Sequence, residues 1–250
     1  RAASAIKRAL AVDDDFAEVH AARGLMQTWL SWDWAAAERS FRASIERNPE
    51  TIFARVWYSF LLDATDRHGE ALAMAESALA LDPLSPYVNT CVGLSLFTQG
   101  RHDEAIEALH QALEMEPDFF YTLWVLGGTY AGAGKGTEAL AVLEKAATLS
   151  SRAPYYLGWL AFGCGRAGRR DQALAIIAEL QERARTEYVA PTFFAWAYAG
   201  LGETEQALDW VEQACEDRTP SLSMHHTTLL ASLRDHERFR EVRRRMGLDP

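Results

Sequence analysis

Short segments of this chain recur at intervals of 34 residues. Three of them read Ser44-Ile-Glu-Arg-Asn-Pro49, Ala78-Leu-Ala-Leu-Asp-Pro83 and Ala112-Leu-Glu-Met-Glu-Pro117, so their prolines at 49, 83 and 117 are spaced by 34. The spacing continues at Ser151, Arg185 and Thr219, where proline is absent. A constant period of this length is typical of arrays of small units, each of which buries its apolar face against its neighbours.

Small and apolar residues keep the same register in six consecutive units. An alanine recurs at Ala37, Ala71, Ala105, Ala139, Ala173 and Ala207, and four residues later come Phe41, Ala75, Leu109, Leu143, Ile177 and Val211. Residues four apart share one face of a helix, so this pattern predicts a helix with a buried face in every unit. Earlier in each unit we expect a second helix to approach closely at a glycine or small residue: Gly24, Ser59, Gly93, Gly127, Ala161 and Ala195.

The six units begin near Ala17, Ile52, Pro86, Phe120, Pro154 and Tyr188. The first unit is one residue longer than the others, and we place the extra residue in Leu30-Ser-Trp-Asp-Trp34. Breaks between helices are predicted near residues 31–34, 66–69, 99–102, 133–136, 166–170 and 200–204.

The glycine-rich stretch 127–137, GGTYAGAGKGT, invites comparison with a phosphate-binding loop. Such a loop needs a glycine five residues before its Gly-Lys pair and a Ser or Thr after it, between a strand and a helix. Here the first position holds Thr129 and the last holds Gly136, and no strand pattern precedes them. We therefore interpret Gly134 as one of four turn glycines in equivalent positions: Gly100, Gly134, Gly168 and Gly202.

A 34-residue period with these small and apolar positions resembles the tetratricopeptide repeat, a pair of antiparallel helices. The best match is Leu126-Gly-Gly-Thr-Tyr130 followed by Ala139 and Leu143, although Trp124 comes one place late and Ser151 replaces a proline. The resemblance implies an all-α fold, a right-handed superhelix that forms a single array over residues 1–250. We expect a partial repeat at 1–16, six helix pairs at 17–219 and capping helices at 220–250.

The C-terminal tail, residues 227–248, resembles a narrower group of repeat proteins. We expect Thr227 to Leu233 to continue the helical pattern, and the charged segment from Arg234 to Leu248 to form a closing helix that ends at Gly247. Apart from His236, which replaces a proline, this tail resembles the end of the repeat region in multidomain bacterial signalling proteins. That resemblance implies a regulatory region attached to a winged-helix, adenylate cyclase or serine/threonine kinase domain.

Composition and residue spacing argue against several other functions. The net charge of −10 disfavours contact with nucleic acids or anionic membranes, and no apolar run approaches the ~20 residues of a membrane span. Cys91, Cys164 and Cys215 are far apart, which indicates free thiols in the cytoplasm. The pair His225–His226 lacks a third metal ligand, and no Gly-x-Ser-x-Gly nucleophile elbow is present. We expect neither an enzyme nor a cofactor.

In the family that this chain resembles, the second, fifth, ninth and twelfth residues of each first helix line a concave groove. In this sequence those positions include only two charged residues, Glu18 and Asp63, and none of the Lys, Arg or Asn with which some relatives grip a terminal carboxylate. Nine of them are aromatic, which predicts a groove for an apolar or extended segment of a protein partner: Phe53, Phe60, Tyr87, Phe97, Tyr121, Trp124, Tyr155, Phe162 and Trp196.

Two alternatives to a peptide groove remain open. The rings can instead fill the space between neighbouring repeats, or the groove can take a small molecule and regulate an attached domain. At the N-terminal end, Ala2, Ile6, Ala9 and Leu10 would lie uncovered at the edge of the array, which predicts a homodimer through exposed repeat ends.

Overall fold

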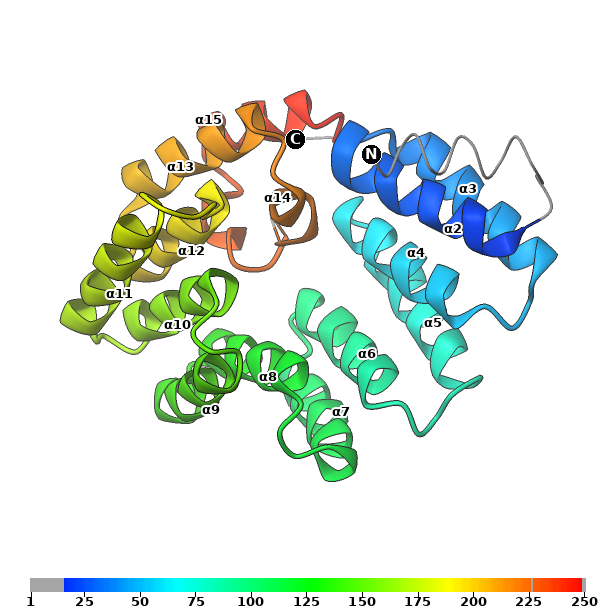
Figure 1. Cartoon of the computed structure of the whole chain (residues 1–250), viewed down its shortest axis with the longest axis horizontal. Helices are drawn as coiled ribbons and strands as arrows, with labels where there is room; N and C mark the ends of the chain where they lie inside the picture. Colours follow the sequence, from blue (N-terminus) through cyan, green and yellow to red (C-terminus); the bar gives the residue numbers. More distant parts are fainter. Residues whose placement is uncertain (1–15, 226, 249–250) are drawn as a thin grey trace.

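The computed structural model describes residues 16–225 and 227–248, in which every regular element is a helix (Figure 1). The predicted all-α array of helix pairs is confirmed. All but one residue of the predicted partial repeat at 1–16, and His226 of the histidine pair, lie outside the described residues. Six pairs follow one another: α2 Ala17–Met26, with its extension η1 Gln27–Ser31, and α3 Trp34–Arg47; α4 Ile52–Ala64 and α5 His68–Leu79; α6 Pro86–Thr98 and α7 His102–Met115; α8 Phe120–Gly132 and α9 Gly136–Leu149; α10 Pro154–Arg166 and α11 Arg170–Arg183; α12 Pro191–Leu201 and α13 Thr204–Glu216.

The helices begin and end where local chemistry requires it. Asp33 and Thr51 cap α3 and α4 by accepting hydrogen bonds from the backbone N–H groups of Ala36 and Ala54. Gly134, in the turn between α8 and α9, has a φ of +75°, a left-handed conformation that glycine adopts without strain. All six predicted breaks overlap the observed turns.

Three of the helix pairs approach closely at the glycine of their first helix. A Cβ on Gly127 of α8 would lie 2.4 Å from Cγ of Leu143 in α9, so only glycine lets these two helices approach this closely. The same relationship joins Gly93 to Leu109 and Gly24 to Phe41. The recurring small residue and the recurring apolar residue are therefore the two sides of one contact.

The extra residue of the first unit lies in the π-helical turn η1 at the end of α2. A π-helix holds one more residue per hydrogen-bonded turn than an α-helix, so it absorbs an insertion without ending the helix. Trp32 then adopts a left-handed conformation, with a φ of 54°, and Asp33 begins the next helix.

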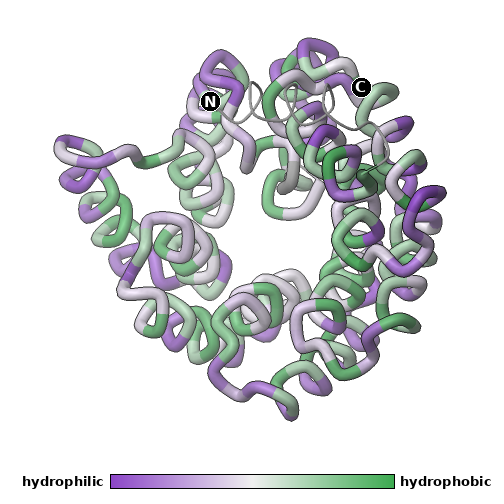
Figure 2. The backbone as a smooth tube through the Cα atoms, turned by 45° about the vertical axis from the view of Figure 1, so that its right-hand side comes forward, coloured by the Kyte–Doolittle hydropathy of each residue, from purple (hydrophilic) through white to green (hydrophobic). Residues whose placement is uncertain are grey.

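The six pairs curve into a nearly closed ring (Figure 1), and Figure 2 shows the same outline with hydrophilic stretches mostly along its outer rim. After α13 come α14 Pro220–His225, the 3₁₀ turn η2 Ala231–Leu233 and α15 Glu237–Arg245. Helix α14 packs against α4 and η1, so the chain crosses the interior of the ring before α15 packs on α13.

Two predictions for the C-terminal half were wrong in detail. Thr227 to Leu233 is not a continuous helix: it forms turns and then η2, while Leu229, Leu230 and Leu233 are each at most 2 % exposed. The spacing of these leucines therefore reflects the burial of their side chains against the surrounding repeats and not a helix. The sixth unit begins at Pro191 rather than near Tyr188, because Pro191 has the fixed φ suited to the first turn of α12.

The closing helix is shorter than expected. It begins at Glu237, where the side chain of His236 accepts a hydrogen bond from the backbone N–H of Arg238, and it ends at Arg245. Gly247 has a φ of +73°, which agrees with the predicted stop.

Candidate binding site

The nine aromatic residues of the predicted groove divide into four groups by exposure. Trp124 and Trp196 are 1 % and 0 % exposed and lie in the core around Trp159, with ring centroids 4.4 and 5.8 Å from that of Trp159. These two indoles fill the space between neighbouring repeats and present no surface to a partner. Trp124 and Trp196 therefore follow the alternative in which the rings pack between repeats instead of lining a groove.

Three tyrosines remain half-buried near the start of successive first helices. Tyr87, Tyr121 and Tyr155 occupy equivalent positions in α6, α8 and α10, and we call them the tyrosine row. The ring centroids of Tyr87 and Tyr121 are 5.2 Å apart, and Trp124 lies between Tyr121 and Tyr155, at 5.3 and 5.6 Å. The buried tryptophan therefore supports the row from behind.

The phenols of the tyrosine row are neutral at physiological pH. Burial raises the pKa of all three above the ordinary value for tyrosine, and the buried thiol of Cys91 contributes to the shift at Tyr87 and Tyr121. The pKa of Cys91 is itself raised by burial, to about 12. A partner would meet apolar rings whose hydroxyls still donate hydrogen bonds.

Phe53 extends the aromatic surface at α4, where its side chain is 49 % exposed. It contacts Trp57, whose ring centroid is 6.0 Å away, and Trp57 contacts Trp29 of η1 at 5.0 Å. Phe193 of α12 meets Tyr155 at 5.7 Å at the other end. The four groove positions of each unit miss Trp57, Trp29 and Phe193, so the sequence pattern does not predict these rings as part of the surface.

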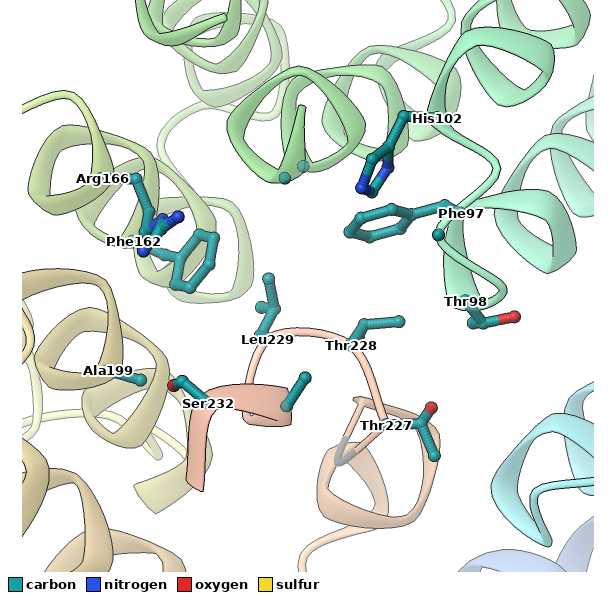
Figure 3. Close-up of a pocket in the computed structure, with 14 residues that line it drawn as sticks. Phe97, Thr98, His102, Phe162, Arg166, Ala199, Thr227, Thr228, Leu229 and Ser232 are labelled. Atoms are coloured by element: carbon teal, nitrogen blue, oxygen red, sulfur yellow. The ribbon is translucent and has the colours of Figure 1, made fainter. Parts of the chain in front are cut away.

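The remaining three predicted residues, Phe60, Phe97 and Phe162, are 8–9 % exposed. Phe97 and Phe162 line a pocket of about 310 Å³ together with residues 227–229, 231 and 232. We call residues 227–232 the inner segment. Figure 3 shows Leu229 of this segment reaching between the two phenyl rings. Part of the predicted groove is therefore filled by the chain itself.

The ring is closed by polar contacts between its first two repeats and its tail. Asp66, in the turn after α4, accepts ion pairs from Arg234 at 2.7 Å and from Arg243 at 2.6 Å. The guanidinium of Arg218 lies 5.1 Å from the ring centroid of Trp32. We call these contacts, together with the hydrogen bond from the indole of Trp34 to the backbone carbonyl of Met246, the seam.

Asp63, predicted to line the groove, is instead a buried acceptor. Its carboxylate receives hydrogen bonds from Ser95 at 3.0 Å and from Thr98 at 2.9 Å, and lies 3.0 Å from Nδ1 of His68. Burial raises the pKa of Asp63 although these partners oppose the shift, and Asp63 in turn holds the pKa of His68 above its ordinary value. Nε2 of His68 lies 3.6 Å from Asp66, which links this cluster to the seam.

Within residues 16–225 and 227–248, no three His, Cys, Asp or Glu side chains are arranged to hold a metal ion. No helix in this described part of the chain combines the length and the hydropathy needed to cross a bilayer.

Successive antiparallel helix pairs stack in one curved array, which is the fold of tetratricopeptide-repeat proteins, and profiles of that family match part of this chain. One tetratricopeptide-repeat profile matches residues 93–154, and a second matches residues 154–179 and 195–213. The sequence matches none of the curated proteins with which it was compared.

Solved structures show the same fold. PilW, described as a widely conserved type IV pilus biogenesis factor, is 18 % identical, with a TM-score of 0.59 over 90 % of this chain and 97 % of PilW. A tetratricopeptide-repeat protein of Thermus thermophilus is 23 % identical, with a TM-score of 0.59 over 66 % of this chain and 90 % of its own. A chain of the APC/C hetero-tetramer Cut9–Hcn1 is 13 % identical, with a TM-score of 0.65 over 98 % of this chain and 45 % of its own.

Proposed function

We propose that this chain is a protein-binding module and that its contact surface is the tyrosine row, extended by Phe53. The observation that carries the proposal is the repetition of a partly exposed tyrosine at the same position of three successive repeats, with the ring centroids of Tyr87 and Tyr121 5.2 Å apart. Tyrosine is enriched where proteins bind, because one side chain offers apolar area and a hydrogen-bonding hydroxyl. An extended, largely apolar segment of a partner fits this surface.

The exposure of the row supports contact rather than packing alone. Trp124 holds Tyr121 and Tyr155 in place from the core, so both rings lose little conformational freedom when a partner binds. Rigid aromatic side chains of this kind are typical anchors of binding surfaces.

The experiment is a selection of peptides from a random library on the immobilised chain, followed by affinity measurements with substituted chains. Tyr121→Ala should lower the affinity of selected peptides at least about tenfold, as expected for an aromatic anchor. Tyr188→Ala is the matched control, because Tyr188 is 72 % exposed and lies outside the row. Peptides that bind the Tyr121→Ala chain as tightly as the original would rule out the row as the contact surface.

A regulatory role in a bacterial signalling protein is a further part of the proposal. It is supported by the resemblance of the tail from Leu233 to Leu248 to the end of the repeat region in such proteins. The sequence encoded upstream of Arg1 tests this part directly, and a sensor or output domain there is the expected finding. Self-association through exposed repeat ends is also proposed, and light scattering over a wide concentration range checks it.

A further inference from the structure

The pocket between the inner segment and the repeats differs in chemistry from the rest of the molecule. Fourteen residues line it, and they include an arginine, a histidine and two phenylalanines but no Asp or Glu. The whole chain carries 35 acidic residues against 25 Lys and Arg. A lining without acids, in a chain with an acidic excess, favours an anionic ligand.

Figure 3 shows how these side chains are arranged. Phe162 and Arg166 of α10 lie on one side of the pocket, and Phe97 and His102 lie on the other. The rings of Phe97 and His102 are 5.9 Å apart and both rest against Gly132, where a Cβ would come within 3.1 Å of either ring. Two aromatic walls therefore face each other, each with a polar group beside it.

Three polar groups at the pocket have no partner within the described part of the chain. Nδ1 of His102 and Oγ1 of Thr227 are buried and form no hydrogen bond. Arg166 forms no ion pair with any described carboxylate, although twelve other arginines do. Buried polar atoms in folded proteins normally have partners, so the atoms of His102 and Thr227 indicate a ligand that supplies them, and the exposed guanidinium of Arg166 is available to the same ligand.

We propose that this pocket binds a small aromatic carboxylate that carries a hydroxyl at the far end of its ring. The carboxylate pairs with Arg166, the ring packs against Phe162, Phe97 and the tip of Leu229, all of which line the pocket, and the hydroxyl bonds to Nδ1 of His102 or to Thr227. A volume of about 310 Å³ lies at the lower end of the range for ligand pockets, which suits a single-ring compound. The site is separate from the tyrosine row, none of whose residues lines it.

Calorimetric titration of the chain with three commercial probes tests the proposal. The probes are 4-hydroxybenzoate, benzoate, which lacks the hydroxyl, and 4-hydroxybenzamide, which lacks the charge. We expect 4-hydroxybenzoate to bind one to one, and each of the other two to bind about tenfold more weakly, since each loses one interaction. No saturable binding of 4-hydroxybenzoate at millimolar concentration, or equal affinity for all three, would overturn the proposal.

Substitutions assign the two ends of the ligand. Arg166→Gln should weaken both carboxylates about tenfold and leave 4-hydroxybenzamide unchanged, and it should fold normally because this side chain is exposed. Arg185→Gln is the matched control: it removes the same charge from an exposed arginine far from the pocket lining. An unchanged affinity for carboxylates in Arg166→Gln would count against the site.

His102→Phe keeps a ring against Gly132 and removes the nitrogen. Where the hydroxyl bonds to Nδ1, this variant abolishes the preference for 4-hydroxybenzoate over benzoate while benzoate binding persists. Thr227→Val, which keeps the shape of the side chain, separates the two candidate donors. A preference that survives in the double variant would disprove the proposed orientation of the ligand.

Discussion

The indole N–H of Trp34 in α3 donates a hydrogen bond of 2.7 Å to the backbone carbonyl oxygen of Met246, a residue 212 positions further along the chain. This bond belongs to the seam and joins the first repeat to the last turn of the tail. Repeat arrays are ordinarily held together by contacts between neighbouring repeats. This hydrogen bond instead joins residues near the two ends of the array.

Trp34→Phe should lower the free energy of unfolding by about 1 kcal/mol, because it removes the donor and leaves the carbonyl of Met246 without it. Urea unfolding monitored by circular dichroism measures the change. Trp210→Phe serves as the control, since the ring of Trp210 is stacked on Phe194 and a phenyl ring keeps that contact. Equal losses in the two variants would show that the seam bond contributes nothing of its own.

Asp66→Asn should destabilise the chain by about 2–3 kcal/mol, because charged hydrogen bonds are stronger than neutral ones and Arg243 is only 2 % exposed. Asparagine tolerates the left-handed backbone of this position, where φ is 58°, so the loss reports on charge rather than strain. Thermal melts provide the measurement. Glu241→Gln, which breaks only an exposed pair with Arg244, should cost less than about 1 kcal/mol. A small effect at Asp66 would mean that the two arginines are held by other contacts.

The stability of the chain should depend on pH through His68. Asp63 raises the pKa of His68 in the folded chain, so the protonated imidazole stabilises the fold fully below its unfolded pKa of about 6.5. That contribution disappears as the pH rises through the higher folded pKa. The difference in unfolding free energy between the original chain and His68→Gln should therefore shrink as the pH rises above about 6.5. Urea titrations at several pH values measure it, and a constant difference would show that the imidazole does not titrate against Asp63.

Trp124→Ala should cost about 3–5 kcal/mol, the range for removing a large buried ring and leaving a cavity. Phe53→Ala, at a position 49 % exposed, should cost less than about 1 kcal/mol. Both variants are compared by chemical denaturation. If Trp124→Ala melted like Phe53→Ala, the indole would be a surface anchor and not part of the core.

The fold could be read from the sequence because its determinants are local and repeated. The contact between Gly127 and Leu143 lies within one unit, and equivalent contacts recur at the same spacing. Thr227 to Leu233 shows the limit of that reasoning. Its leucines are spaced as on a helix, but the segment lies buried beside α6 and α10, which are far away in the sequence and leave no trace in local periodicity.

The candidate site was only partly predictable for the same reason. Periodicity places Tyr121 and Trp124 on the inner face of α8, but exposure depends on what the neighbouring repeat places opposite them. Trp159 covers Trp124, whereas Tyr121 stays at the edge of the array. The pocket beside Phe97 and Phe162 could not be foreseen, because its other wall comes from the tail.

An open array of repeats frays from its ends, and each repeat adds its own twist independently of the others. With Asp66, Trp32 and Trp34 bound to the tail, the first repeats and the last helices of the described array are joined, so a change of twist is constrained at both. The contact between Trp34 and Met246 therefore ties the orientation of the first repeat to that of the tail. The seam thus couples the two ends of the array, and we expect a partner that changes the twist of one repeat to change the geometry of the seam.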